Sequence, residues 1–415
     1  MNAQTTHLRQ AILLLFLSLP FSLARAQPEP FHIGEKAVLS SKMLGEEREV
    51  WVHVPRNLAK AKTTQRFPVV YVLDGDQHFH SLSGLVHQLS ATNGNTLCPE
   101  MIVVAILNTD RTRDLTITHD TAGFAVDPGF ARNSGGAEKF TSFLEQELFP
   151  FIDAQYPTAP YRTLVGHSLG GMLVVNTLLN HPQLFDAYVA LDPSLWWDEQ
   201  LLVKQAPARL KEKRFDGKTF YLAVANALNS PEDTAALRKE TNDYNVLLNS
   251  QLDFADLLAA HPGNGLRWRH AYFKEESHTT VPLMGEYHAL RFIFDFHPFK
   301  ALDRLFDPGF DADSALTAHY QMISQRMGYK VMPPEEFLDG LGHAYLESAL
   351  LDKAEGVLGL NLQNYPQSPG VYVGMGDWCV GKGDAKAALS YYRQALRLKK
   401  DPEIEKKISR LNQKI

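Results

Sequence analysis

The sequence predicts an α/β fold, in which a mostly parallel sheet carries helices on both faces and is followed by a small all-α domain. Two observations carry this prediction. Short apolar runs, typical of strands buried on both faces, alternate with segments whose apolar residues recur at helical spacing. Strands that alternate with helices form parallel sheets covered on both faces. After about residue 300 the strand pattern stops and only helical spacing remains.

Length and composition limit the classes of protein to consider. The chain has 415 residues, which is long for one domain, so we expect two domains, at residues 27–300 and 301–415. With 45% hydrophobic and 21% charged residues, the composition is that of an ordinary globular protein. The formal net charge is -6 and no basic run is present, so nucleic acid is not an expected partner.

The first 26 residues have the pattern of a secretory signal peptide. Arg9 supplies the early positive charge, residues 11–23 form an apolar stretch, and Ala24-Arg25-Ala26 is an A-x-A cleavage site. An uncleaved anchor is the alternative, but the stretch is short for a spanning helix. We therefore expect cleavage after Ala26 and a secreted, periplasmic protein with no membrane span.

No signal for a cofactor stands out. Cys98 and Cys379 are the two cysteines, and their spacing does not indicate a disulfide, so we expect two free or buried thiols. CxxC, HExxH and GxxxxGK patterns are absent from the sequence. Neither a metal nor an organic cofactor is therefore expected.

The first elements follow one another in a regular order. Residues 27–57 alternate apolar and polar positions, which predicts two antiparallel strands at a sheet edge. Residues 67–73 and 101–107 are continuous apolar runs and predict buried strands, with a helix near 78–90 between them.

The later elements continue the alternation. Residues 108–136 have little periodicity and predict a long loop, and residues 137–155 show helical spacing. A short apolar strand at 163–165 is followed by Gly-His-Ser-Leu-Gly and then by a helix that ends at Asn180. Further strands are predicted at 188–191, 219–225 and 266–273, and helices near 232–260 and 283–296. Active sites of such sheets lie at the carboxyl ends of the strands.

The turn after residue 167 carries the strongest chemical signal. Gly166-His167-Ser168-Leu169-Gly170 matches G-x-S-x-G in the strand–turn–helix context that a nucleophile elbow requires. Side chains at Gly166 and Gly170 would collide with the neighbouring strand and helix, so we expect glycine at both positions. Ser168 is the predicted nucleophile. The alternative is a glycine-rich turn with a helix-capping serine.

A serine hydroxyl becomes a good nucleophile only when a base removes its proton. With this motif the chain order is serine, acid, histidine, and the histidine follows the last strand. His278 lies in such a loop, at residues 275–282, and is the predicted general base. His270, His288 and His261 are expected to be structural or surface residues.

The acid is harder to place. The residues directly after the strand at 219–225 carry no carboxylate. Asp233 and Glu240 are the nearest candidates, with Glu232 and Asp243 behind them. A serine–histidine dyad without an acid remains the third option.

Acyl transfer also needs donors for the tetrahedral oxyanion, usually two backbone N–H groups. Leu169, directly after the nucleophile, is one predicted donor. Asp76, in the loop after the strand that ends at Leu73, is the other.

The chain beyond residue 300 contains an internal repeat. Leu341-Gly342 is echoed by Met375-Gly376, and Ala354 is echoed by Ala388. Both offsets are 34 residues, the tetratricopeptide period. We expect a small tetratricopeptide-like domain that could bind a protein partner, with generic helical hairpins as the alternative.

The first of these regions resembles the Putative esterase family of α/β-hydrolases, and within it the enterochelin-esterase branch. The likeness spans about residues 33–297. It rests on Val72-Leu73-Asp74-Gly75, on the stretch 108–116, on Gly166-His167-Ser168-Leu169-Gly170-Gly171, on Asp192-Pro193-Ser194-Leu195-Trp196-Trp197, and on Ser277-His278 followed by Val281-Pro282-Leu283.

The resemblance implies an α/β-hydrolase with nucleophile Ser168, base His278 and oxyanion donors Asp76 and Leu169. The related mycolyltransferases use a glutamate that looks like Glu240 or its neighbourhood. Some siderophore esterases are described as dyads. The acid that esterase D-like members carry directly after the strand is absent here, which leaves the identity of the acid open.

Three further residues are candidates for substrate binding. Arg111 and Arg113 could hold an anionic substrate, because arginine binds carboxylates and phenolates bidentately. Their alternative is an internal ion pair with Asp110 or Asp114. Trp196 could line the acyl pocket or belong to the core.

The sequence thus predicts a serine esterase acting on a small-molecule ester, such as a siderophore lactone or a sugar ester. An acyltransferase that uses the same site is one alternative. A non-catalytic scaffold that binds a partner through its helical repeats is the other.

Overall fold

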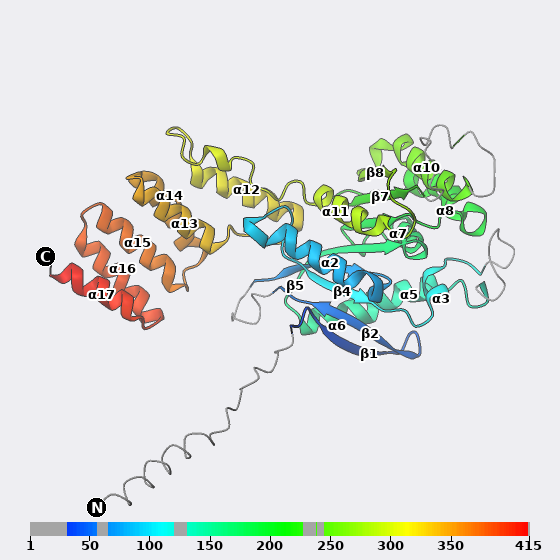
Figure 1. Cartoon of the computed structure of the whole chain (residues 1–415), viewed down its shortest axis with the longest axis horizontal. Helices are drawn as coiled ribbons and strands as arrows, with labels where there is room; N and C mark the ends of the chain where they lie inside the picture. Colours follow the sequence, from blue (N-terminus) through cyan, green and yellow to red (C-terminus); the bar gives the residue numbers. More distant parts are fainter. Residues whose placement is uncertain (1–30, 56–64, 120–130, 227–237, 239–244, 414–415) are drawn as a thin grey trace, which may run out of the picture. The chain divides into compact units, whose positions relative to one another are not determined.

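The computed structural model describes residues 31–55, 65–119, 131–226, 238 and 245–413 (Figure 1). Residues 34–413 belong to one compact unit. The boundary predicted at residue 300 therefore stays a prediction. The predicted signal peptide, residues 1–26, lies outside the described residues.

An eight-stranded sheet lies at the centre of the described hydrolase region, in the order β1-β2-β4-β3-β5-β6-β7-β8. From β4 to β8 all neighbouring strands are parallel, while β1 and β2 form an antiparallel hairpin beside β4. The strands are β1 (Glu35–Ser41), β2 (Glu46–His53), β3 (Phe67–Val72), β4 (Ile102–Ile106), β5 (Thr158–His167), β6 (Ala187–Leu191), β7 (Thr219–Ala225) and β8 (Arg267–Phe273). The predicted α/β fold with an antiparallel edge is confirmed.

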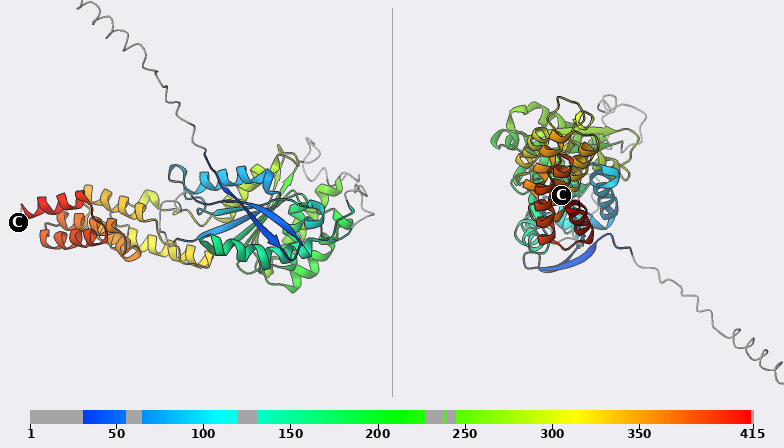
Figure 2. Two further views of the ribbon diagram at one scale, coloured as in Figure 1. Left: turned by 90° about the horizontal axis from the view of Figure 1, so that it is seen from below. Right: turned by 90° about the vertical axis from the view of Figure 1, so that its left-hand side faces the viewer.

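Helices cover both faces of the sheet (Figures 1 and 2). The helices of this region are α2 (Gly75–Ser90), α3 (Arg111–Leu115), α5 (Ala137–Phe143), α6 (Phe149–Gln155), α7 (Leu169–Asn180), α8 (Trp197–Glu212), α10 (Asn245–Ala260) and α11 (Val281–Ile293), with a π-helical turn, η3 (Leu144–Leu148), between α5 and α6. Helices α2 and α11 pack together against one face. Helices α7, α8 and α10 pack against the other.

The burial of the central strands explains why their sequences are apolar throughout. Every residue of β3, β4, β6 and β7 is buried. Helix α7 is also buried along its whole length, except at its final residue, Asn180. A sheet covered on both faces leaves no polar side for these strands. The chain segments that follow them are consequently held in fixed positions at one edge of the sheet.

Two predicted segments differ from the structure. The loop predicted at 108–136 contains the short helix α3, and its residues 120–130 lie outside the described part. The helix predicted at 232–260 is described only as α10, from Asn245, and as the single residue Arg238. The second difference is one of coverage, because residues 232–237 and 239–244 lie outside the described residues.

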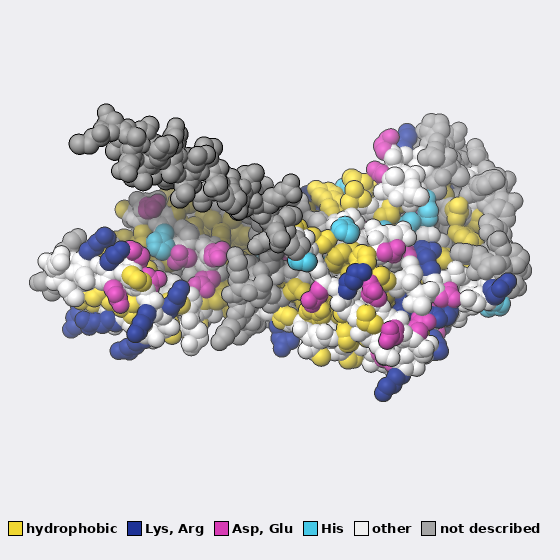
Figure 3. Space-filling model, turned by 60° about the horizontal axis from the view of Figure 1, so that its bottom comes forward, with side chains coloured by type: hydrophobic (Ala, Val, Ile, Leu, Met, Phe, Trp, Pro, Cys, Tyr) yellow, Lys and Arg dark blue, Asp and Glu magenta, His cyan; other side chains and the backbone are white. Residues whose placement is uncertain are grey.

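The C-terminal region is helical, as predicted. Its helices are α12 (Ala312–Met327), α13 (Glu335–Glu347), α14 (Leu351–Asn364), α15 (Pro369–Gly381), α16 (Ala385–Leu398) and α17 (Pro402–Asn412). Helices α13 and α14 form one hairpin, and α15 and α16 form another. On the face shown in Figure 3, basic and acidic side chains are interspersed over the described surface.

The two hairpins use the same contact at equivalent positions. A Cβ on Gly342 would lie 2.4 Å from Leu358, and a Cβ on Gly376 would lie 2.4 Å from Tyr392. Each glycine and each partner is separated from its counterpart by 34 residues. The period found in the sequence therefore corresponds to a close helix crossing, at which a larger residue than glycine would require the facing side chain to shift.

Two absences hold for the described residues. No helix there is long and apolar enough to cross a membrane. No group of three or more His, Cys, Asp or Glu side chains there could hold a metal ion. Cys98 and Cys379 are both buried and unbonded.

Candidate active site

Ser168 lies at the sharp turn between β5 and α7. Its backbone has φ 58° and ψ -116°, a conformation that L-residues with side chains rarely adopt. A Cβ on Gly166 would lie 2.4 Å from the backbone of Gly170, so the turn requires glycine at 166. The predicted strand–turn–helix geometry is present.

The structure refines the roles of the following glycines. A Cβ on Gly170 would meet Asp74 and Leu73 at 3.4 Å, which is close to ordinary contact. A Cβ on Gly171 would lie 2.9 Å from the Cα and Cβ of Pro193. The tight position after the serine is therefore Gly171 rather than Gly170.

His278 is paired with a carboxylate that the sequence analysis did not select. Its Nδ1 lies 2.5 Å from Oδ2 of Asp192. Asp192 follows β6 directly, is buried, and has φ 44°. Its other oxygen, Oδ1, accepts a hydrogen bond from the Ala225 amide at 2.9 Å. Both carboxylate oxygens have fixed partners, so the orientation of the pair is set by the sheet.

This pairing decides which nitrogen of His278 is basic. A carboxylate accepts hydrogen bonds, so Nδ1 of His278 carries the proton in the bond to Asp192. Nε2 is then the nitrogen with a free lone pair in the neutral ring. The imidazole is half-buried, with 42% of its side-chain surface exposed, so a ligand can reach it.

The hydroxyl of Ser168 has its own partner. Within the described residues its side-chain hydrogen bond is with Oγ of Ser194, at 3.2 Å. The Ser194 amide in turn donates to the Ser168 carbonyl at 3.0 Å. Without substrate, hydrogen bonds of catalytic groups are often long or poorly aligned.

The two predicted oxyanion donors occupy comparable places. Leu169 is the first residue of α7, and Asp76 is the second residue of α2. The amides of the first helical turn have no partner inside their helix. Strands β3 and β5, which lead into these helices, are neighbours and parallel, so both helix starts lie at the same sheet edge.

Arg111 is tied to the segment after β3. Its Nε and Nη2 donate to the two oxygens of Asp74 at 2.6 and 2.9 Å, and Asn108 donates to the same carboxylate at 2.7 Å. Burial raises the pKa of Asp74, but the hydrogen bonds and charge of Arg111 outweigh it and hold that pKa below its usual value. About 31% of the Arg111 side chain remains exposed.

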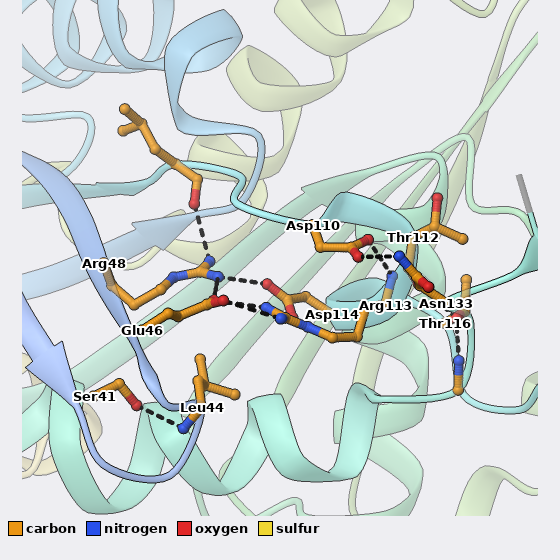
Figure 4. A network of polar contacts seen from close by, with 12 residues as sticks. Ser41, Leu44, Glu46, Arg48, Asp110, Thr112, Arg113, Asp114, Thr116 and Asn133 are labelled. Atoms are coloured by element: carbon orange, nitrogen blue, oxygen red, sulfur yellow. Dashed lines mark hydrogen bonds and ion pairs between the residues drawn. The ribbon is translucent and has the colours of Figure 1, made fainter.

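Arg113 is engaged in a separate ion-pair network (Figure 4). It donates to Glu46 through Nη1 and Nη2, at 3.0 and 2.6 Å, and to Asp114 through Nε, at 2.7 Å. Asp114 also accepts from the buried Arg48 at 2.6 Å. The hydrogen bond from Arg113 lowers the pKa of Glu46 to about 2. This network includes the Arg113–Asp114 pair that the sequence analysis named as the alternative.

The remaining predicted residues lie as follows. Trp196 is half-buried and packs on the core, next to the fully buried Trp197 at 5.8 Å between ring centroids. His261 contacts the Leu257 carbonyl and His270 stacks on Trp268. The predicted acids Asp233 and Glu240, and their neighbours Glu232 and Asp243, lie outside the described residues.

Asp192 is the residue that the sequence analysis missed. The search for an acid was confined to the segment after β7, whereas Asp192 follows β6. The signal was available, because Asp192 stands at the carboxyl end of a buried strand and opens one of the motifs quoted above.

Comparison with known proteins identifies the family. The model of the Putative esterase family matches residues 41–278, more than half of the chain. The chain belongs to the Putative esterase family. The family resemblance noted in the sequence, with its expectation of a hydrolase acting on esters, is confirmed.

Several known proteins are similar to this chain. Siderophore triacetylfusarinine C esterase of Aspergillus fumigatus is 29% identical over 46% of this chain and 65% of its own length, just under two thirds. Ferri-bacillibactin esterase BesA of Bacillus subtilis is 26% identical over 56% of this chain and 80% of its own. The structure of an IroE-like serine hydrolase from Shewanella oneidensis is 31% identical, with a TM-score of 0.66, over 80% of this chain and 99% of that one.

Proposed function

We propose that this protein is a serine esterase that hydrolyses siderophore esters through an acyl-enzyme on Ser168. One observation carries the proposal. Asp192 and the strained turn at Ser168 follow the neighbouring strands β6 and β5, and Asp192 is paired at 2.5 Å with His278, which follows β8 of the same sheet. Serine, acid and base then occur in the chain order 168, 192, 278, which is the order of α/β-hydrolases.

The acylation step uses each of these groups once. Nε2 of His278 removes the proton from Oγ of Ser168 as Oγ forms a bond to the ester carbonyl carbon. The carbonyl electron pair moves to oxygen, and the amides of Leu169 and Asp76 hold the resulting oxyanion. When this intermediate collapses, the ester C–O bond breaks and His278 gives its proton to the leaving alcohol.

Deacylation repeats the sequence with water. His278 removes a proton from water as the water oxygen bonds to the acyl carbon and the carbonyl electron pair moves to oxygen. When this second intermediate collapses, the bond between the acyl carbon and Oγ of Ser168 breaks, the acid leaves, and His278 gives its proton to Oγ. Asp192 stays ionised, keeps Nδ1 protonated, and stabilises the imidazolium that forms in each step. Asp233 and Glu240 remain the alternative acids, and the substitutions Asp233→Asn and Glu240→Gln test them.

The substrate class rests on the relatives. The Aspergillus protein is named for triacetylfusarinine C and the Bacillus protein for ferri-bacillibactin, both siderophore esters. For this chain we propose a siderophore lactone or linear ester. Arg111 keeps about 31% of its side chain exposed and could hold an anionic group, and Trp196 could line the acyl side. The engagement of Arg113 in its own network argues against a role for it in binding.

The remaining features complete the proposal. We propose that residues 1–26 direct the protein to the periplasm or the exterior. We also propose that the 34-residue repeats are tetratricopeptide-like and bind a protein partner. Their matching glycine contacts support the first part of this idea.

A panel of esters tests the function. Purified wild-type protein should hydrolyse a catecholate trilactone and its linear esters faster than feruloyl, acetyl-sugar or short-chain nitrophenyl esters. Ser168→Ala should abolish every activity, while Ser324→Ala, on α12, should leave each rate within about twofold. Preference for a sugar ester would reject the siderophore assignment. Ester formation with an added alcohol, in excess of hydrolysis, would favour the acyltransferase alternative.

A further inference from the structure

His167 occupies the second position of the Gly-His-Ser-Leu-Gly turn, directly before Ser168. It is the last residue of β5, and its side chain is half-buried. Its Nε2 lies 2.8 Å from the backbone carbonyl oxygen of His278. A carbonyl oxygen can only accept, so Nε2 of His167 carries a proton and donates it.

The two imidazole rings also lie against each other. Their centroids are 4.4 Å apart, with 41° between the planes. His167 is bonded covalently to Ser168 and contacts His278 in two ways. Its ring packs against the His278 ring, and its Nε2 donates a hydrogen bond to the His278 carbonyl oxygen. The side chain of His278 is directed by Asp192, but its backbone is held by His167.

A neutral His167 can donate this hydrogen bond without placing a positive charge beside His278. Burial, together with the nearby charges of His278 and His78, lowers the pKa of His167 to about 4. At neutral pH its ring therefore adds no positive charge beside the imidazolium that forms on His278. The Arg111 guanidinium lies near its backbone, with Nη2 3.4 Å from the His167 carbonyl oxygen.

The other side of His167 is packed against a buried polar pair. The ring of His78, from α2, meets the His167 ring edge-on at 6.0 Å. Nδ1 of His78 lies 3.2 Å from Oε1 of Glu286, whose side chain is fully buried in α11. Helix α11 is also the helix that the His278 loop enters. His167, which contacts the His278 loop, is thus itself packed against the buried pair of His78 and Glu286.

We propose that His167 is a positioning residue, which fixes the backbone of the His278 loop relative to Ser168 through its Nε2–H hydrogen bond. The proposal rests on the proposed function. Its physical reason is that a base displaced by about 1 Å can slow a reaction on the order of 100-fold. His167 is adjacent to Ser168 in the chain and hydrogen-bonded to the backbone of His278. A movement of the turn therefore moves Ser168 and His278 together.

Two substitutions separate the hydrogen bond from the space that the ring fills. Gln places an amide N–H near the position of Nε2, whereas Leu has similar bulk and no donor. We expect His167→Leu to lower kcat by about 10- to 100-fold with KM changed less than about threefold. We expect His167→Gln to retain kcat within about threefold of wild type.

A second measurement keeps the test valid if one variant folds poorly. In the wild type, the Nδ1 proton of His278 should give a far-downfield proton NMR signal, because it is held between nitrogen and the Asp192 carboxylate. The signal should persist in His167→Gln and broaden or disappear in His167→Leu at the same pH. Far-ultraviolet circular dichroism of each variant reports whether the fold is intact.

Three outcomes would each reject one of the two proposals. If wild type shows no esterase activity and no serine labelling, the proposed function fails. If wild type is active but both variants retain its kcat and its NMR signal, the positioning role is overturned. Equal loss of kcat in both variants overturns it as well, since the ring rather than the donor would then be required.

Discussion

The two oxygens of Asp192 have different partners, the His278 imidazole and the Ala225 amide. This arrangement could not be read from the sequence alone, because it depends on which strand ends lie side by side. The strained turn at Ser168 and the loop position of His278 could be predicted, since each has a local sequence pattern, while their catalytic roles stay predictions. Asp192 opens a recognisable motif at the end of a buried strand, but strands β6 and β7 are equally apolar, so the sequence does not choose between their ends.

Replacing Asp192 tests the acid directly. Asp192→Asn keeps the size of the side chain but removes the charge and can impose the wrong tautomer on His278. We expect kcat to fall by about 1,000-fold or more, with little change in KM. Steady-state kinetics on the best ester of the panel provide the measurement.

Three other acidic residues are compared with Asp192, one as a control and two as the alternative acids. Asp216→Asn, at an exposed pair with Arg214, should leave kcat within about twofold. If instead Asp233→Asn or Glu240→Gln abolishes activity and Asp192→Asn does not, the acid lies after β7. Near-wild-type rates for all of these variants would mean a serine–histidine dyad.

The lowered pKa of His167 also makes a prediction about stability. Its pKa falls from 6.5 to about 4 on folding, so between these values the unfolded chain binds more protons than the folded one. The contribution of His167 to stability is therefore full above pH 6.5 and is lost as pH drops toward 4. By the linkage relation this amounts to about 2 kcal/mol between pH 7 and pH 5.

Urea unfolding at the two pH values measures this contribution. Wild type should lose about 2 kcal/mol more than His167→Gln does on going from pH 7 to pH 5. An equal loss in both proteins would show that His167 is not held neutral by its surroundings.

At the scale of elements, the strands and helices of the sheet region were predictable because burial on both faces leaves an apolar imprint. The contacts that shape the segment around α3 could not be predicted from the sequence. Arg48 and Asp114 are 66 residues apart in the chain, and no local pattern links them. The sequence analysis could name Arg113 and Asp114 only as neighbours that might form an internal pair.

Two neighbouring glycines of α7 should respond differently to alanine. At Gly171 the new Cβ would lie 2.9 Å from Pro193, so we expect Gly171→Ala to destabilise the protein by about 1–3 kcal/mol. At Gly170 the contact is 3.4 Å and the residue is helical, so Gly170→Ala should be within about 1 kcal/mol of wild type. Urea titration of both variants checks this, and the reverse order would contradict the account of the turn.

The ion-pair network around α3 should contribute strongly to stability. Asp114→Asn leaves the buried guanidinium of Arg48 without one of its two carboxylate partners, so we expect a loss of about 3 kcal/mol. Glu403→Gln, at the exposed pair with Lys406, should cost less than about 1 kcal/mol. Similar costs for the two variants would show that the network is not a buried structural pair.

At the scale of the whole molecule, a lysine adds polar contacts to the apolar packing that joins the helical repeats to the segment before them. Nζ of Lys353, in α14, donates to the carbonyls of Leu305, Asp307 and Phe310, at 3.1, 2.6 and 2.9 Å. The sequence revealed the repeat through its glycine period, but not this lysine, because carbonyl partners leave no trace in a sequence.

Lys353→Met should loosen this connection without touching the active site. We expect a lower melting temperature and faster amide hydrogen exchange across residues 305–310, while kcat and KM stay within about twofold of wild type. Lys386→Met, at an exposed position of α16, is the matched control and should change neither. An unchanged exchange rate in Lys353→Met would remove the lysine as an anchor.

The central claim is that Ser168 is the nucleophile and that His278 and Asp192 activate it. Labelling with a fluorophosphonate, followed by peptide mass spectrometry, tests it most directly. We expect a single adduct on Ser168, none in Ser168→Ala, and labelling slowed by about 100-fold or more in His278→Ala and in Asp192→Asn. Equal labelling of wild type and Ser168→Ala, or an adduct on another residue, would contradict the account.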